Sequence, residues 1–278
     1  MSANAKVVIP RDSLLSVTAK GVIESLTYKD YFYNDINFNG IYLGNNVSAN
    51  LNMDSPLNQF DINGDITFGD SLGFIVDGNV QRLNLSPFIL METWNTPLLT
   101  TQIEANMSGT TIDDMTGTLV IDNTSIVDSN FIYNPGPIYL QALADAGEGK
   151  KLQIMSEFME AEIIGDYYFS SIAKEVKQVL RPHLPSLLSE TSDNQLESTN
   201  ENIFQDTELS NEEVELSGKN NFDFNIQLSN TEDLSYTFAL PFYNVEQATI
   251  NGSVNMKDNN SLQINGYIPR MMFGKNDI

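Results

Sequence analysis

The sequence contains no cysteine, one histidine and one tryptophan among its 278 residues. The absence of cysteine excludes disulfides, thiolate zinc sites and cysteine nucleophiles, and it fits any compartment, including an oxidising periplasm. The single histidine, His183, lies between Pro182 and Leu184. A partly exposed or capping histidine is the simpler interpretation there than a general base.

Positive charge is also scarce. The chain has 14 Lys and Arg residues against 37 Asp and Glu residues, which gives a formal net charge of -23. Nucleic-acid binding requires clustered Lys and Arg to neutralise phosphates, so this composition argues against it, and the same charge repels anionic headgroups.

Long apolar runs are missing as well. No run approaches the roughly 18 residues that a membrane-spanning helix requires, and the opening segment "MSANAKVVIP" has no signal-peptide core. The final segment "PRMMFGKNDI" has no terminating element. We expect the sequence to be an internal piece of a longer chain, with any targeting or anchoring segment outside it.

What the sequence does have is period-two alternation of apolar and polar residues, from Lys6 to about Phe169 and again from about Val214 to Met272. Clusters of Asn, Asp, Ser and Gly separate these segments, which predicts a mostly β protein with short antiparallel connections. "FDINGDITF", residues 60–68, and "SLQINGYIP", residues 261–269, are typical; "LSYTFALPF", residues 234–242, is also predicted to be a strand.

One segment has a different period. Residues 170–190 begin with Ser170 and place apolar residues three and four apart, which predicts an amphipathic helix that Pro182 and Pro185 end or kink. Residues 191–215 carry Asp and Glu without Lys or Arg, which predicts a disordered acidic insertion. The predicted organisation is therefore a β-groove segment (1–169), the helix (170–190), the insertion (191–215) and a continuing β-groove segment (216–278).

Glycine recurs at equivalent strand positions in segments such as "INGDI", "VDGNV", "IIGDY" and "INGYI". Nine of the 17 glycines share this context: Gly21, Gly40, Gly64, Gly78, Gly109, Gly117, Gly165, Gly252 and Gly266. By parity, Gly64 falls on the same side of its strand as Ile62 and Ile66. Glycine on an apolar strand face costs about 0.5 to 1 kcal/mol relative to alanine, so its recurrence indicates a structural purpose. Glycine kinks let a long sheet curl, and a curled sheet with one apolar face can form a groove.

Several segments together resemble the AsmA/TamB-like envelope proteins. They are "MSGTTIDDMTGTLVIDNTSI" (107–126), the stretch from Lys150 to Leu188 with its strand and following helix ending in "LP", "GNVQRLNLSPF" (78–88) and "MDSPLNQFDINGDI" (53–66). The resemblance covers most of residues 15 to 190. It implies a long, taco-like β-sheet in the periplasm of a Gram-negative envelope, anchored in the inner membrane through a segment absent from this chain. It also implies phospholipid movement to the outer membrane, or assistance to outer-membrane barrel assembly with a barrel partner.

We therefore expect a mostly β fold, a long curled, predominantly antiparallel sheet that forms an apolar groove, with one amphipathic helix. The expected function is conduction of phospholipid acyl chains, with no enzymatic activity and no cofactor or metal. Some 15 to 18 strands spaced about 4.8 Å apart would give a groove of about 70 to 85 Å. The expected lining residues are Ile62, Gly64, Ile66, Phe68, Val76, Gly78, Val80, Leu119, Ile121, Ile163, Gly165, Tyr167, Ile264, Gly266 and Ile268.

Other interpretations remain open at this stage. Asp61, Asn63 and Asp65 alternate like the first ligands of a calcium loop, but Ile66 and Leu72 stand where such a loop requires Gly and Glu. Carboxylate pairs at Asp113 and Asp114, or near Glu24 and Asp30, could serve glycoside hydrolysis, although acidic pairs in turns are mostly solvated. The same strands could also build a filled, adhesin-like β-sandwich or solenoid, or present an edge that accepts incoming strands.

Overall fold

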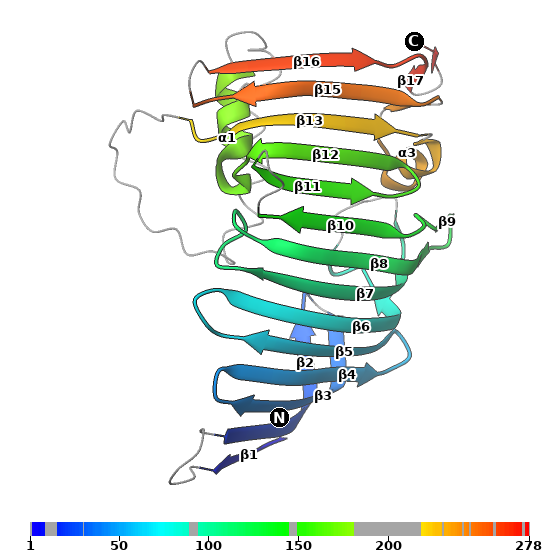
Figure 1. Ribbon diagram of the computed structural model, residues 1–278. Coiled ribbons are helices and arrows are strands. Elements are labelled where there is room, and N and C mark those ends of the chain that lie inside the picture. The colour runs from blue at the N-terminus through cyan, green and yellow to red at the C-terminus, as the bar shows by residue number, and fades with distance from the viewer. Residues whose placement is uncertain are drawn as a thin grey trace.

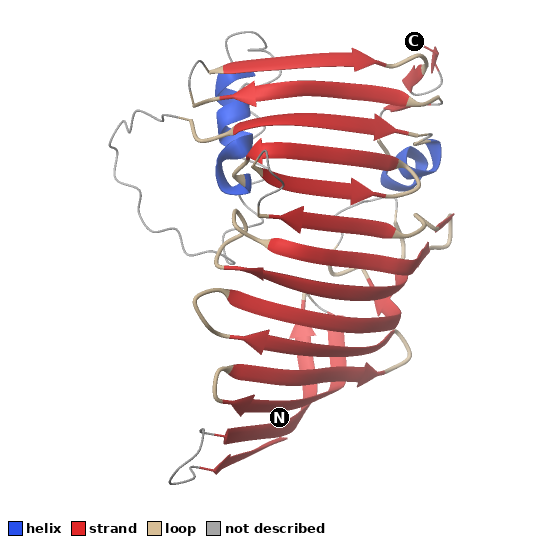
Figure 2. Ribbon diagram, viewed as in Figure 1, coloured by secondary structure: helices blue, strands red, loops and turns tan. Residues whose placement is uncertain are grey.

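The chain folds into a mostly β architecture in which a single large antiparallel sheet remains open (Figures 1 and 2). The structure is a computed structural model. It describes residues 2–8, 16–29, 31–88, 94–144, 149–180, 218–229, 231–240, 242–244, 246–257, 260–273 and 276–277. The expected long curled sheet is confirmed.

Among the described residues, the large sheet has 15 strands; β9 pairs there with β8 alone, and the others follow one another in chain order from β1 to β16. Its strands are β1 (Ser2–Val8), β2 (Ser16–Tyr28), β3 (Tyr31–Leu43), β4 (Asn46–Asp54), β5 (Asn58–Thr67), β6 (Leu72–Asn84), β7 (Leu98–Gly109), β8 (Thr116–Val127), β9 (Ile132–Tyr133), β10 (Ile138–Leu143), β11 (Lys150–Met155), β12 (Met159–Asp166), β13 (Asn221–Leu228), β15 (Ala248–Asn255) and β16 (Ser261–Tyr267). A second sheet of three short strands contains β14 (Phe242–Asn244), β17 (Met271–Phe273) and β18 (Asn276–Asp277). Fourteen strands side by side span about 60 Å at 4.8 Å per strand.

The β2–β3 hairpin extends beyond its neighbours and bends over the sheet. β3 pairs with β4 only from Asn37 to Leu43, whereas its pairing with β2 continues to the tip. Asp35 has a φ of 57°, and the alternation of inward and outward side chains along β3 shifts by one residue there. Tyr33 and Ile36, three residues apart, are therefore both buried. Tyr33 packs with Met53 of β4, and Figure 1 shows the far part of the hairpin running behind the neighbouring strands. We call residues 24–29 and 31–36 the arm.

Helix α1 (Phe169–Leu180) packs on the sheet at one end of its later strands. The predicted apolar spacing explains this contact, because Ile172, Val176 and Val179 lie against a cluster that contains Leu152 and Phe222. The described helix lies within the predicted span of 170–190 apart from its first residue. Residues 181–190 and the predicted acidic insertion at 191–215 lie outside the described residues.

A buried carboxylate joins α1 to the start of the next strand. Glu175 is 5% exposed and accepts hydrogen bonds from Asn220 Nδ2 at 2.8 Å and from the backbone N–H groups of Lys219 and Asn220 at 3.3 Å each. Burial alone would raise the pKa of Glu175, but these bonds, with one from Ser171, outweigh it and hold the pKa below its usual value. The helix is thus fixed to the chain just before β13.

The strand predicted from "LSYTFALPF" is wrong, because this segment contains a second helix, α3 (Glu232–Phe238). Glu232 and Asp233 occupy its first turn, where negative charge favours a helix, and Ala239 ends it in a left-handed conformation. Leu234 and Phe238, four residues apart, lie on one helical face and pack against a cluster around Trp94, Ile126 and Tyr133. The spacing of four outweighed the aromatic strand propensity of the segment.

Candidate functional site

The apolar side chains of successive strands lie opposite one another in a continuous row. Ile62 of β5 lies opposite Leu51 of β4 and Gly78 of β6, and the row continues through β7, β8 and β10. Its members, in order, are Phe38, Leu51, Ile62, Gly78, Ile103, Ile121 and Ile138. Because the side-chain period of a strand is two, all of them lie on one face of the sheet. We call this the apolar face.

A second row continues the apolar face into the later strands. It comprises Ala142, Leu152, Ile163, Phe224, Gly252 and Ile264, each opposite the next. Its first members are buried together with residues that contact α1, whereas Ile264, on the edge strand β16, is 57% exposed. The apolar face therefore extends from the arm to the last strand of the large sheet.

Burial along the apolar face shows where it is covered. Three clusters are packed: the arm on Met53 and Phe60, α1 on Leu152 and Phe222, and α3 on the Trp94 region. Between these clusters, the predicted lining residues Ile62, Ile66, Val76, Leu119 and Ile121 are half-buried. The middle of the face is thus neither a filled core nor an ordinary solvated surface.

The fifteen predicted lining residues divide into three groups. Ile62, Gly64, Ile66, Val76, Leu119, Ile121, Ile163 and Gly165 are half-buried on the apolar face. Gly78, Val80 and Tyr167 are buried, and Tyr167, at 3% exposure, belongs to the cluster that contacts α1. Phe68, Ile264, Gly266 and Ile268 are exposed; Phe68 and Ile268 lie just past the ends of their strands.

Sequence reasoning missed several residues of this face. Ile103, Met107, Phe224 and Ile250 lie on it by register but were not among the predicted lining residues. Their own alternation would have placed them there: Ile103 and Met107 both step by two from Ala105 in "TTQIEANMSG".

The opposite side of the sheet is mostly polar, although Ile41 and Ile75 are exposed on it. Asn39, Asn50, Asn63, Asp77 and Glu104 form one row across β3 to β7. Their side chains bond laterally: Asn50 Nδ2 donates to Asp61 Oδ1 at 2.7 Å and to Asn63 Oδ1 at 2.9 Å. Asp65 accepts a hydrogen bond from Ser48. The calcium-like alternation of residues 61–65 is therefore part of a polar strand face, and in the described part of the chain no group of three or more His, Cys, Asp and Glu residues could hold a metal ion.

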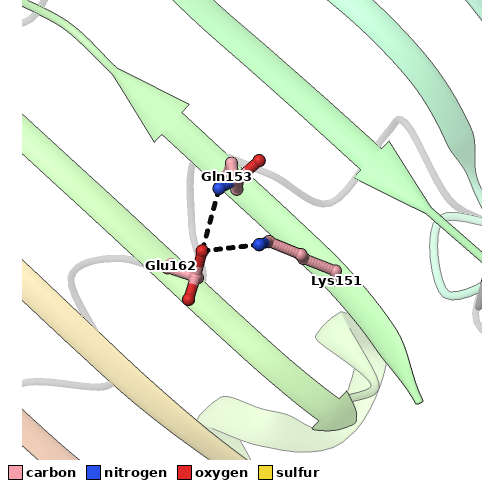
Figure 3. Close-up of polar contacts among 3 residues, drawn as sticks. All are labelled: Lys151, Gln153 and Glu162. Carbon is pink, nitrogen blue, oxygen red and sulfur yellow. Dashed lines mark hydrogen bonds and ion pairs between the residues drawn. The ribbon is translucent and has the colours of Figure 1, made fainter. Parts of the chain in front are cut away.

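The polar face also carries an ion pair between neighbouring strands. Lys151 Nζ lies 2.8 Å from Glu162 Oε2, which also accepts a hydrogen bond from Gln153 Nε2 at 2.8 Å (Figure 3). The hydrogen bond from Lys151 lowers the pKa of Glu162, with a smaller contribution from Gln153. These three side chains stabilise the pairing of β11 with β12 on the side away from the apolar residues.

Two of the carboxylates considered for catalysis, Asp113 and Asp114, have structural partners. Asp114 accepts hydrogen bonds from the backbone and hydroxyl groups of Thr110 and Thr111, which lower its pKa and close the β7–β8 turn. Asp113 accepts a hydrogen bond from the backbone N–H of Ser170 at 3.0 Å, at the start of α1. Lys150 Nζ also donates to the backbone oxygen of Asp113, at 2.9 Å. Asp30 and His183 lie outside the described residues.

Comparisons with known proteins identify no relative: no protein-family model matches the chain, and neither the curated proteins nor the solved structures contain a match. Within the ranges that the structure describes, neither helix is long and apolar enough to cross a membrane.

Proposed function

We propose that this chain is a section of a lipid-conducting surface, in which phospholipid acyl chains lie along the apolar face and headgroups remain in solvent. One observation carries the proposal: the apolar face runs without interruption across the strands of an open sheet, and its middle is half-buried. An acyl chain on this face is kept out of water at about 0.8 kcal/mol per methylene group. Between the places that the arm, α1 and α3 cover, the face presents apolar side chains from strand to strand, so an acyl chain can slide there without a catalytic residue.

The resemblance to AsmA/TamB-like proteins supports the setting we propose. In it, the chain lies in the periplasm of a Gram-negative envelope, is anchored in the inner membrane through a segment outside this sequence, and works with an outer-membrane β-barrel partner. The formal charge of -23 also suits this role, because it keeps the protein surface from adhering to anionic headgroups.

A filled sandwich or solenoid is less well supported. Either one requires a second apolar layer facing the first. In the described part of the chain, the second sheet consists of the three short strands β14, β17 and β18, and the packing elements α1, α3 and the arm contact the apolar face only in separate places.

Quenching of tryptophan fluorescence by phospholipids with brominated acyl chains tests the proposal. The native Trp94 is first replaced by Phe, and a single Trp is then introduced at Leu119 on the apolar face or at Thr118 on the polar face. These positions are adjacent in β8, so the two variants differ in the direction of one side chain. We expect quenching in Leu119→Trp and little in Thr118→Trp. Equal quenching at both positions, or none at Leu119, would overturn the proposal.

A further inference from the structure

The arm brings a buried polar group to one end of the apolar face. Tyr33 is 8% exposed, and the neighbours that pack with it are the apolar side chains of Ile23, Ile36, Met53 and Phe60. Its hydroxyl oxygen is inaccessible to solvent and has no hydrogen-bond partner among the described residues. A buried donor without an acceptor is costly, so such a group requires an explanation.

Around Tyr33, the arm presents apolar and aromatic side chains that are only partly covered. Leu26 is 47% exposed, Tyr28 44% and Tyr31 38%. The register pairs Leu26 with Tyr33 and Tyr28 with Tyr31, so these four side chains lie on one face of the hairpin. This face is directed at the sheet, because Tyr33 packs with Met53 of β4 and Phe60 of β5. The ring of Tyr28 also stacks on Phe88, just past the end of β6, with 5.8 Å between ring centroids.

The arm also carries one of the few cations of the chain. Lys29 Nζ lies 5.5 Å from the centroid of the Tyr28 ring. Burial and the neighbouring Tyr28 and Tyr31 raise the pKa of Tyr33, so its hydroxyl keeps its proton and can donate a hydrogen bond at neutral pH. The end of the apolar face thus combines a hydrogen-bond donor, a positive charge and aromatic rings.

We infer that the arm and strands β3 to β5 form a seat for the polar end of a long-chain amphiphile, with Tyr33 Oη donating a hydrogen bond to a carboxylate or ester carbonyl oxygen. The inference rests on the proposed function, because the acyl chain of the same ligand continues along the apolar face. The residues of β3 that precede Asn37 pair only with β2 in the described structure. The arm can therefore lift to admit the ligand without breaking the backbone pairing in the rest of the sheet.

The test compares the wild-type protein with Tyr33→Phe, which removes the hydroxyl and keeps the ring. Displacement of an environment-sensitive apolar dye measures the affinity of dodecanoate, methyl dodecanoate and dodecane, the last of which has no acceptor. We expect Tyr33→Phe to bind methyl dodecanoate about five-fold more weakly, because one neutral hydrogen bond is lost, and dodecanoate more than about ten-fold more weakly, because a charge-assisted hydrogen bond is lost. Dodecane should bind equally well. Tyr139→Phe, which removes a hydroxyl from an exposed side chain of β10 on the polar side of the sheet, is the matched control and should leave all three affinities unchanged.

Two further measurements separate the possible outcomes. If a free carboxylate is the natural head, Lys29→Met should lower the affinity for dodecanoate and leave the affinity for its methyl ester unchanged. If the natural head is a glyceryl ester, Lys29→Met should not change the two affinities differently. Tyr33→Phe should be at least as resistant to urea as the wild type, because it removes an unpartnered buried hydroxyl. A loss of stability, or unchanged affinity for both acceptor-bearing ligands while dodecane still binds, would overturn this inference alone. Failure of dodecane to bind the wild type would instead contradict the proposed function.

Discussion

Two glycines that look alike in the sequence should respond in opposite ways to alanine. Gly165 in "IIGDY" has a φ of 128°, and a Cβ atom there would lie 2.5 Å from the backbone oxygen of Asn221 and 2.8 Å from the Cα atom of Phe222. Gly64 in "INGDI" has no such φ, and its Cβ atom would meet only the backbone oxygen of Ile75, at 3.9 Å. The backbone therefore requires glycine at one position and tolerates alanine at the other.

The magnitudes follow from these distances. A side chain in a sparsely populated conformation costs about 1 to 3 kcal/mol, and overpacking costs about 1 to 3 kcal/mol more, so Gly165→Ala should lower the free energy of unfolding by about 2 to 6 kcal/mol. Gly64→Ala should raise it by about 0.5 to 1 kcal/mol, because alanine has less conformational entropy to lose on folding.

Urea denaturation followed by circular dichroism measures both variants. With an m-value of about 3 kcal/mol/M, the midpoint should fall by about 0.7 to 2 M in Gly165→Ala and rise by about 0.2 to 0.3 M in Gly64→Ala. Gly266→Ala is a second control, because nothing lies within 4 Å of its Cβ position. Equal losses in Gly165→Ala and Gly64→Ala would refute the reasoning, since they would show that the recurring glycines are equivalent after all.

Three further predictions concern the packing around the apolar face. The pKa of Glu175 is lowered in the folded protein, so its contribution to stability is present above its unfolded pKa of about 4.5 and is lost as the pH falls through the folded value. Urea midpoints measured at descending pH should therefore fall more steeply in the wild type than in Glu175→Gln. Glu162→Gln should change the free energy of unfolding by less than about 1 kcal/mol, because its ion pair with Lys151 is partly exposed; a larger loss that survives high salt would contradict this. Phe238→Ala should shift the emission of Trp94 to longer wavelength by loosening α3 from the buried indole, and an unchanged spectrum would show that α3 does not cover it.

The strand order and the apolar face could be predicted from the sequence because both depend on local patterns. Alternation around Ile62 and Ile163 determines which side chains share a face once neighbouring strands pair, and short polar turns make antiparallel neighbours the simplest arrangement. The amphipathic spacing of Ile172, Val176 and Val179 likewise identified the contact surface of α1.

The features that could not be predicted depend on single residues or on contacts distant in sequence. The inversion at Asp35, and a second positive φ at Asn123, interrupt the alternation in ways that no periodic pattern shows. Tyr33 is buried because the arm folds back over β4 and β5. Predicting this contact would require knowing how far β2 and β3 extend beyond the strands that neighbour them. Helix α3 is positioned by its contact with Trp94, which lies well over a hundred residues earlier in the chain. Local propensity takes no account of a contact so distant in the sequence.

Photo-crosslinking with phospholipid tests the central claim most directly. A photoreactive side chain is placed at Ile62 or Ile103 on the apolar face, and at the adjacent outward positions Asp61 or Glu104 as matched controls. The protein is irradiated in the presence of phospholipid, and adducts are identified by mass spectrometry. The account predicts phospholipid adducts at Ile62 and Ile103 and none at Asp61 and Glu104. The absence of adducts at both inward positions, or equal adducts on the two faces, would contradict it.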